Sequence, residues 1–172
     1  MSLEGQFFGD HPPLEPNYIP YKYDELFKTD LKNNVKYTFV WEISEFSLRP
    51  EENGERLHSK VFTIKGPSDK VTKWSVQLYP RGKKKIDKNY VSIYLVSMID
   101  QDVEAKYIFS TLDANKVKQK IFDGLFEGKE GWGRDKAIQR SKIAQHTPSD
   151  ILTLFVEITV SGGNLDNSMG SN

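Results

Sequence analysis

Apolar residues recur at every second position in five stretches of this chain, and this pattern constrains the fold more than any other feature. Successive side chains of a β-strand point to opposite faces, so a period of two predicts a strand with one buried face, whereas a helix needs a period of about 3.6. The five stretches are 35–43, 74–78, 91–95, 103–109 and 152–160. Each of them therefore predicts a strand.

Weaker alternation in three further stretches raises the expected number of strands to about eight. These stretches are 57–64, 118–126 and 132–138. Turn-forming residues separate the predicted strands, as in Asn53-Gly54 and Gly66-Pro67. Short, evenly spaced strands with one apolar face each favour two packed sheets. We predict an all-β fold, an antiparallel eight-stranded β-sandwich with one or two short helical turns, one of them within 135–145.

The two ends of the chain differ in composition from the predicted body at 35–161. Four prolines lie between positions 12 and 20, and each restricts its own backbone and that of the residue before it. Residues 1–35 also hold six acidic residues against three lysines. We expect 1–34 to be a flexible, acidic, Pro-rich arm with one helical turn near 23–29. We expect 162–172, which is rich in Gly, Asn and Ser, to be a disordered tail.

The number of cysteines and the lengths of the apolar stretches indicate the cellular compartment of the protein. The 172 residues contain no Cys, which excludes thiolate chemistry and weighs against the disulfide-stapled secreted class. No Asn-x-Ser/Thr sequence occurs, and no stretch approaches the roughly 18 consecutive apolar residues of a membrane span. These observations predict a cytoplasmic or nuclear protein without a membrane segment.

The charge balance argues against a nucleic-acid partner. Lys and Arg total 24 and Asp and Glu total 24, whereas binding to phosphate backbones needs an excess of basic residues on one face. One local run departs from this balance, with Arg81, Lys83, Lys84, Lys85 and Lys88 around a glycine. The run fits either a solvated hairpin loop or a contact with phosphate or an acidic partner.

Catalytic and metal-binding patterns are scarce in the sequence. The three histidines, His11, His58 and His146, are far apart and belong to no metal-binding motif. No Gly-x-Ser-x-Gly nucleophile motif occurs, and the glycine-rich stretch 124–130 lacks the spacing of a phosphate-binding loop. We therefore expect no enzyme, no catalytic residue, no cofactor and no metal site.

Two segments are suited to gripping a peptide. Tyr90 and Tyr94 alternate with the aliphatic residues of 91–95 and so point to the outer face of the predicted sheet, where they form a binding patch or are isolated surface tyrosines. In the stretch 128–134, Trp132 fits a pocket wall, glycines permit close backbone approach, and basic residues flank them. A buried Trp at the start of a strand is the alternative for that stretch.

The order of these segments resembles the MATH domain, also called the TRAF-like domain. The segments that carry the resemblance are FVWEISEFS at 39–47, NGE at 53–55, SKVF at 59–62, KWSVQLYPRG at 73–82, YVSIYL at 90–95, AKYIFS at 105–110, WG at 132–133 and DILTLFVEI at 150–158. The resemblance covers about 35–160 and is closest to the speckle-type POZ branch of the family.

This resemblance implies an eight-stranded antiparallel sandwich that binds short extended Ser/Thr-rich peptides across one sheet. In the speckle-type branch, such domains recruit substrates to a cullin-RING ubiquitin ligase through a BTB domain, which is absent from this chain. The TRAF and deubiquitinase branches imply the alternative, a self-associating or scaffold domain that binds receptor tails or other proteins. No heptad pattern precedes Val35, so we expect the isolated domain to be monomeric.

The resemblance also implies a set of peptide-binding residues. The pocket tyrosine of the family matches Tyr94, and its neighbouring aromatic matches Tyr107, which shares its parity with Phe109 and so also fits a core position. The family's Lys and Trp-Gly pair match Lys129, Trp132 and Gly133.

This chain departs from the speckle-type pattern Gly-Lys-Asp-Trp-Gly-Phe in three ways. Glu130 replaces the aspartate, Gly131 is an extra residue, and Arg134 replaces the phenylalanine. The aromatics expected just upstream fall on Asp123 and Leu125, unless a gap moves Phe122 or Phe126 into place. We include Arg134 in the predicted site, where a guanidinium favours acidic or phosphorylated ligands.

Overall fold

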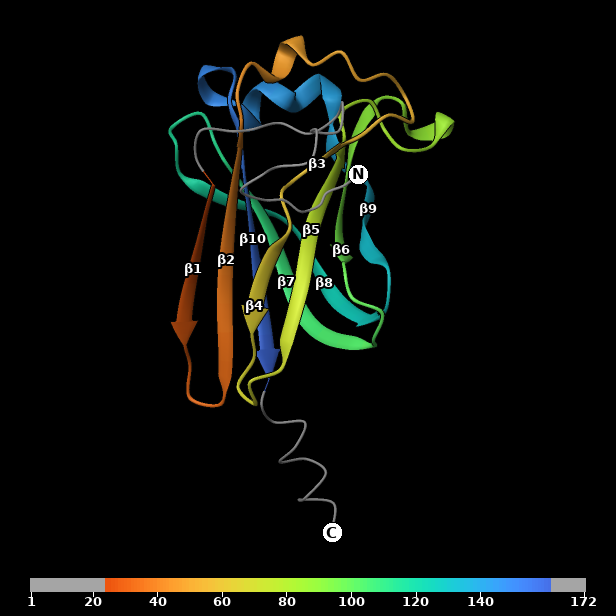
Figure 1. The fold of residues 1–172 in the computed structure, drawn as a ribbon. Coiled ribbons are helices and arrows are strands. Elements are labelled where there is room, and N and C mark those ends of the chain that lie inside the picture. The colour runs from red at the N-terminus through yellow and green to blue at the C-terminus, as the bar shows by residue number, and fades with distance from the viewer. Residues whose placement is uncertain (1–23, 162–172) are drawn as a thin grey trace, which may run out of the picture.

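The computed structural model describes residues 24–161 and shows an antiparallel β-sandwich (Figure 1). The predicted Pro-rich part of the arm and the predicted tail lie outside the described residues. The strands are β1 (Asp24–Asp30), β2 (Asn34–Ile43), β3 (Leu57–His58), β4 (Phe62–Lys65), β5 (Val71–Tyr79), β6 (Tyr90–Ser97), β7 (Val103–Leu112), β8 (Lys118–Gly128), β9 (Gly131–Gln139) and β10 (Leu152–Ser161).

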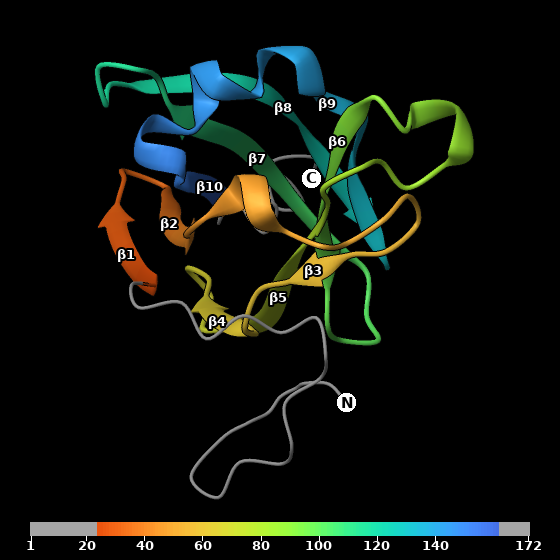
Figure 2. The ribbon, with the colours of Figure 1, turned by 90° about the horizontal axis from the view of Figure 1, so that it is seen from above.

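Two five-stranded sheets face each other, as the view from above shows (Figure 2). One sheet has the order β1-β2-β10-β7-β8, and the other has the order β3-β5-β6-β9 with β4 also paired to β5. Neighbouring strands in both sheets run antiparallel. The predicted all-β sandwich is therefore confirmed.

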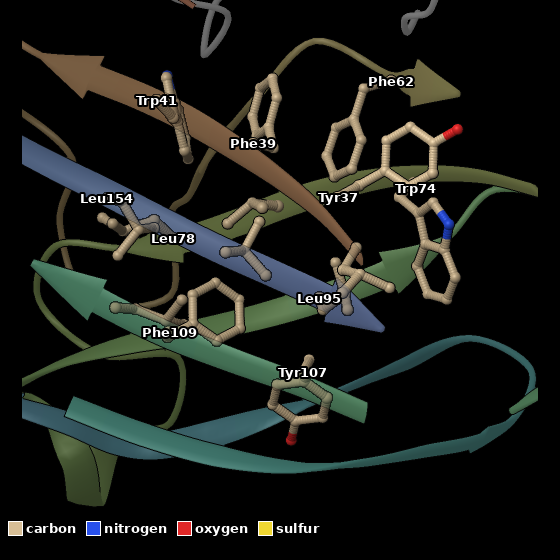
Figure 3. Packing of buried hydrophobic residues seen from close by; sticks show 14 of the residues in the cluster. Tyr37, Phe39, Trp41, Phe62, Trp74, Leu78, Leu95, Tyr107, Phe109 and Leu154 are labelled. Atoms are coloured by element: carbon tan, nitrogen blue, oxygen red, sulfur yellow. The ribbon is translucent and has the colours of Figure 1, made fainter. Parts of the chain in front are cut away.

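The apolar residues of the five alternating stretches meet between the sheets (Figure 3). Phe39 of β2 stacks on Phe62 of β4 with ring centroids 4.1 Å apart, and Trp74 of β5 meets Phe126 of β8 edge to face at 4.9 Å. Burying a side chain of this size stabilises the fold by about 1.5–3 kcal/mol. The core thus forms from the predicted faces.

Residues 24–161 form ten strands rather than the eight predicted, for two reasons. The predicted strand at 57–64 is divided into β3 and β4, and β1 is additional. Residues 24–30 pair with β2 along their whole length, so the expected helical turn near 23–29 and the boundary of the body at 35 are wrong. β1 lies at a sheet edge, where Leu26 is 38% exposed and Phe27 is 50% exposed, and so it lacks a buried apolar face.

Short 3-10 helices occupy the connections: η1 (Phe46–Leu48), η2 (Lys85–Asp87), η3 (Arg140–His146) and η4 (Pro148–Asp150). The helical turn expected within 135–145 is correct only in its second half, because β9 continues to Gln139 before η3 begins. Among residues 24–161, no helix has the length and apolar character needed to cross a bilayer.

Candidate functional site

Strand β9 forms one edge of its sheet and holds three of the six predicted peptide-binding residues. It pairs with β6 and, within the described part of the chain, has no strand on its other side (Figure 1). An edge strand presents unpaired backbone N–H and C=O groups that can bond to another chain. The predicted site therefore lies on an edge that is open to an extended ligand.

The register between β6 and β9 assigns each site residue to a face. Trp132 is opposite Leu95 and Arg134 is opposite Ile93, and both aliphatic partners are fully buried between the sheets. Directly opposed residues of an antiparallel pair point to the same side. Trp132 and Arg134 therefore face the side between the two sheets, whereas Gly133, opposite Tyr94, belongs to the outer face.

Trp132 forms a partly exposed wall on the inner side of the edge. Its side chain is 43% exposed, and its ring meets Phe126 edge to face at a centroid distance of 6.5 Å. The indole Nε1–H donates a hydrogen bond to the Glu127 carbonyl at 2.8 Å. The indole is thus held in place while one part of it remains available for contact.

Arg134 lies on the same side as Trp132, one step further along. Its guanidinium carbon is 5.4 Å from the centroid of the Phe122 ring, which is a cation–π distance. Phe122 and Phe126, rather than the exposed Asp123 and Leu125, therefore stand beside the two β9 side chains. The arrangement fits the gapped match of the upstream aromatics.

Tyr107 is a core residue, which corrects its assignment to the peptide-binding surface. It is 4% exposed, and its ring packs edge to face against Phe109 at 5.8 Å and against Phe122 at 6.3 Å. Burial raises the pKa of the Tyr107 phenol, Arg134 opposes this shift, and Asp123 adds to it. The Tyr107 hydroxyl points away from Leu95 and Phe109 (Figure 3).

Lys129 lies in the turn between β8 and β9. Its Nζ is 3.1 Å from Asp100 Oδ1, in the turn that follows β6. This ion pair raises the pKa of Lys129. The predicted hydrogen-bond donor is therefore three residues from Trp132 in the sequence, but its ammonium is already paired with a carboxylate.

Two glycines shape the open edge. At Gly133 an added Cβ would lie 2.0 Å from the Ile93 carbonyl oxygen, so no side chain fits there. Ser97 N–H donates to the Glu130 carbonyl at 2.7 Å, which makes residues 97 and 130 a hydrogen-bonded pair. Such pairs alternate with non-bonded pairs along an antiparallel ladder, so the N–H and C=O of Gly131 point away from β6, toward the open edge.

On the outer face, Tyr94 belongs to a polar network that sequence reasoning missed. Its hydroxyl donates to Asp135 Oδ1, and Lys84 Nζ is 2.9 Å from Asp135 Oδ2. Burial, reinforced by the bond to Asp135, raises the pKa of Tyr94. The hydrogen bonds from Tyr94 and Lys84 in turn lower the pKa of Asp135.

The basic run at 81–88 is part of this network rather than a fully solvated loop. Lys83 Nζ is 5.0 Å from the Tyr94 ring centroid and 6.0 Å from that of Tyr79, whose ring meets Tyr94 edge to face. Ser92 Oγ accepts from the Lys83 backbone N–H at 3.0 Å and donates to the Asp135 carbonyl at 2.6 Å. The loop is thereby connected to both β6 and β9.

The comparison with known families agrees with this architecture. A family model described as "MATH domain" matches residues 38–158. The chain belongs to the MATH domain family. The TRAF5 structure from Notothenia coriiceps is similar to this MATH domain, with a TM-score of 0.53 and 18% sequence identity over 70% of this chain and 72% of that chain. At this identity the likeness concerns the fold alone.

MATH domains are protein-interaction modules, which agrees with a site built from a strand edge and exposed side chains. Within residues 24–161 no group of three or more His, Cys, Asp or Glu side chains is placed to hold a metal ion. A cavity of about 600 Å³ lies between the β1–β2 and β4–β5 turns and contains none of the six predicted residues. The β9 edge therefore remains the candidate site of this MATH domain.

Proposed function

We propose that this MATH domain binds short, extended, Ser/Thr-rich peptide segments along the open edge of β9. The observation that carries the proposal is that the edge at Gly131, which pairs with no further strand of residues 24–161, lies next to the partly exposed indole of Trp132. Strand addition of this kind draws affinity from backbone hydrogen bonds and specificity from alternate side chains.

The two faces of β9 offer different contacts to alternate residues of such a ligand. Residues that point toward the space between the sheets would meet Trp132 and Arg134. Residues that point outward would cross Gly133, which has no side chain, and reach the Tyr94 ring. The chemistry on one side is aromatic and cationic, and on the other it is that of a phenol with a bound carboxylate.

Arg134 extends the proposal to ligands with acidic or phosphorylated residues. A guanidinium bonds carboxylate and phosphate with two parallel N–H groups, and Arg134 is exposed apart from its contact with Phe122. A single short peptide in a shallow edge site is expected to bind with micromolar affinity, about −8 kcal/mol.

The role in the cell that we infer is recruitment of substrates to a cullin-RING ubiquitin ligase, through a BTB domain elsewhere in the assembly. This inference rests on the resemblance to the speckle-type POZ branch. The alternative is a scaffold domain of TRAF or deubiquitinase type that binds receptor tails or other proteins. Purification of the full-length natural protein separates them: a cullin in the complex supports recruitment, and a trimer on receptor tails supports the alternative.

Peptide binding itself is tested by titrating a Ser/Thr-rich peptide library and following backbone amide resonances. We expect shifts at Gly131, Trp132 and Tyr94. Trp132→Ala should weaken binding at least about tenfold, since aromatic anchors dominate such contacts. Phe27→Ala, a half-exposed aromatic on the edge strand of the other sheet, is the matched control and should leave binding unchanged. Absence of shifts along β9 with every peptide would refute the proposal.

A further inference from the structure

We propose that the loop at 81–88 supplies an anion subsite at this peptide site, in which Lys83 receives an acidic side chain of the ligand. The inference rests on the proposed peptide binding and adds the chemistry of one ligand position. Three observations support it. Hydrogen bonds hold the loop in one conformation, the Lys83 ammonium forms no ion pair with residues 24–161, and Gly133, which has no side chain, lies between the open edge and Tyr94.

The loop is fixed by one amide side chain. Asn53 Nδ2 donates to the carbonyls of Arg81 at 2.8 Å, Gly82 at 3.1 Å and Lys84 at 2.9 Å. The Gly54 N–H also donates to the Gly82 carbonyl at 2.9 Å. A basic loop without such bonds would lose side-chain and backbone entropy on binding an anion, whereas this loop has lost much of it already.

Two further contacts fix the conformation of the loop. Arg81 Nη1 donates to the carbonyls of Arg49 at 3.1 Å and Glu51 at 2.6 Å. Gly82 has a φ of +82°, and a Cβ added there would lie 2.1 Å from the Asp87 carbonyl oxygen. The loop therefore closes tightly on itself, beside β6 and β9 at one end of the sandwich (Figure 2).

Lys83 and Lys84 of this loop both face the sheet, but of the two only Lys84 forms an ion pair with the described residues. Lys84 is paired with Asp135, whose other carboxylate oxygen accepts from Tyr94. For Lys83, no carboxylate of residues 24–161 lies within ion-pairing distance, and its ammonium sits over the Tyr94 and Tyr79 rings. An exposed ammonium held over aromatic rings without an acidic partner is a ready site for a carboxylate.

Nearby charges strengthen the preference for an anion. Lys136 Nζ lies 5.5 Å from the ring centroid of Tyr90, on the same outer face of β6 as Tyr94. Asp135 forms its ion pair with Lys84 and interacts with Lys83 only at longer range, so one carboxylate faces the three ammonium groups of Lys83, Lys84 and Lys136. The local field at the outer face is therefore positive, although the whole chain has no net charge.

The path from the open edge to Lys83 is short. Gly133 is directly opposite Tyr94 in the β6–β9 ladder and has no side chain to block an outward-pointing ligand residue. A ligand strand along β9 therefore has one outward position from which a Glu or Asp side chain crosses Gly133 toward the Tyr94 ring and the Lys83 ammonium. We assign the acid preference to that position.

The test is a positional scan of peptides of about eight residues. The starting point is the tightest Ser/Thr-rich binder, and each position is replaced in turn by Glu or by Gln. At one position Glu should bind about three- to tenfold more tightly than Gln at about 50 mM salt, and the difference should shrink at about 300 mM salt. Lys83→Gln should abolish that difference, whereas Lys88→Gln, which removes an exposed lysine of the same loop, should preserve it.

The outcomes separate this inference from the proposed function. Peptides that bind along β9 without any Glu preference sensitive to Lys83→Gln would overturn the subsite and leave the peptide site standing. An equal loss in Lys83→Gln and Lys88→Gln would also overturn it, because general electrostatics would then suffice. If no peptide binds the unaltered domain, both proposals are refuted. A second peptide, with phosphoserine at the preferred position, should bind at least as tightly as the peptide with Glu there.

Discussion

The Tyr94 hydroxyl donates a hydrogen bond to the Asp135 carboxylate, and this bond joins β6 to β9 next to an irregularity in their ladder. The register shifts between Val91 and Ile93, so three residues of β9, starting with Asp135, lie opposite Ser92 alone. Asp135 follows the inward-facing Arg134 and so lies on the outer face, where its carboxylate meets both Tyr94 and Lys84. Regular alternation thus places Asp135 beside Tyr94, and the irregular part of the ladder lies next to this contact.

Removing either partner of this bond should destabilise the domain. We expect Tyr94→Phe and Asp135→Asn each to lower the free energy of unfolding by about 0.5–1.5 kcal/mol, a modest value because Asp135 is partly exposed. Urea unfolding of both single variants and the double variant measures the coupling. Costs that add independently would show that the bond contributes nothing measurable.

Asn53→Ala should loosen the loop at 81–88 without touching its lysines. The loss of three hydrogen bonds to loop carbonyls should cost about 1–2 kcal/mol of stability. It should also reduce the preference for Glu over Gln in the bound peptide, since Lys83 would no longer be preorganised. Peptide titration of this variant checks the point, and an unchanged preference would show that the loop's rigidity is irrelevant to anion selection.

The core position of Tyr107 predicts that its hydroxyl does not take part in peptide binding. Tyr107→Phe should leave peptide affinity within about twofold, in contrast to Trp132→Ala. Gly124→Ala should destabilise the domain by about 1–3 kcal/mol, because its Cβ would lie 2.5 Å from the Tyr107 hydroxyl oxygen. Calorimetric unfolding and peptide titration of the two variants test these expectations. A large loss of affinity in Tyr107→Phe would return the residue to the binding surface.

Stability should depend on pH through His146. Burial lowers the pKa of this histidine below its ordinary value of 6.5, and its Nδ1 forms a 2.8 Å hydrogen bond with the hydroxyl of Thr111, which is fully buried. Because the unfolded chain then binds the proton more readily, stability should fall as the pH drops below about 7 and level off below the folded pKa.

The size of this effect is bounded by one proton, about 1.4 kcal/mol per pH unit. His146→Gln should flatten the profile in that range. Urea unfolding at several pH values between about 7 and 5 measures it. A variant that retains the full pH dependence would assign the titration to another group.

Much of the fold follows from local pattern. The alternating stretches predict the buried faces of β2, β5, β6, β7 and β10, because a half-buried strand must segregate its side chains. β1 was not predictable in this way, since neither Leu26 nor Phe27 is buried and the strand exists through its pairing with β2. The division of 57–64 into β3 and β4 likewise follows from tertiary pairing with β5.

Several residues of the candidate site could be predicted from the sequence, but their arrangement in space could not. The outward orientation of Tyr94 follows from parity, because its neighbours Ile93 and Leu95 are core residues. The side taken by Trp132 and Arg134 does not, since β9 begins with Gly, Trp, Gly and Arg and has no apolar alternation to set its register. Asp135 was also missed, because its partners come from β6 and from the loop at 81–88.

Hydrogen exchange at the Gly131 amide tests the central claim, that an extended peptide adds to the edge of β9. In the free domain this N–H faces away from β6 and should exchange rapidly with solvent. With a saturating Ser/Thr-rich peptide, the account predicts at least about tenfold slower exchange at Gly131, with no change at Phe27 in the edge strand of the other sheet. Tight peptide binding that leaves exchange at Gly131 unaltered would contradict the account.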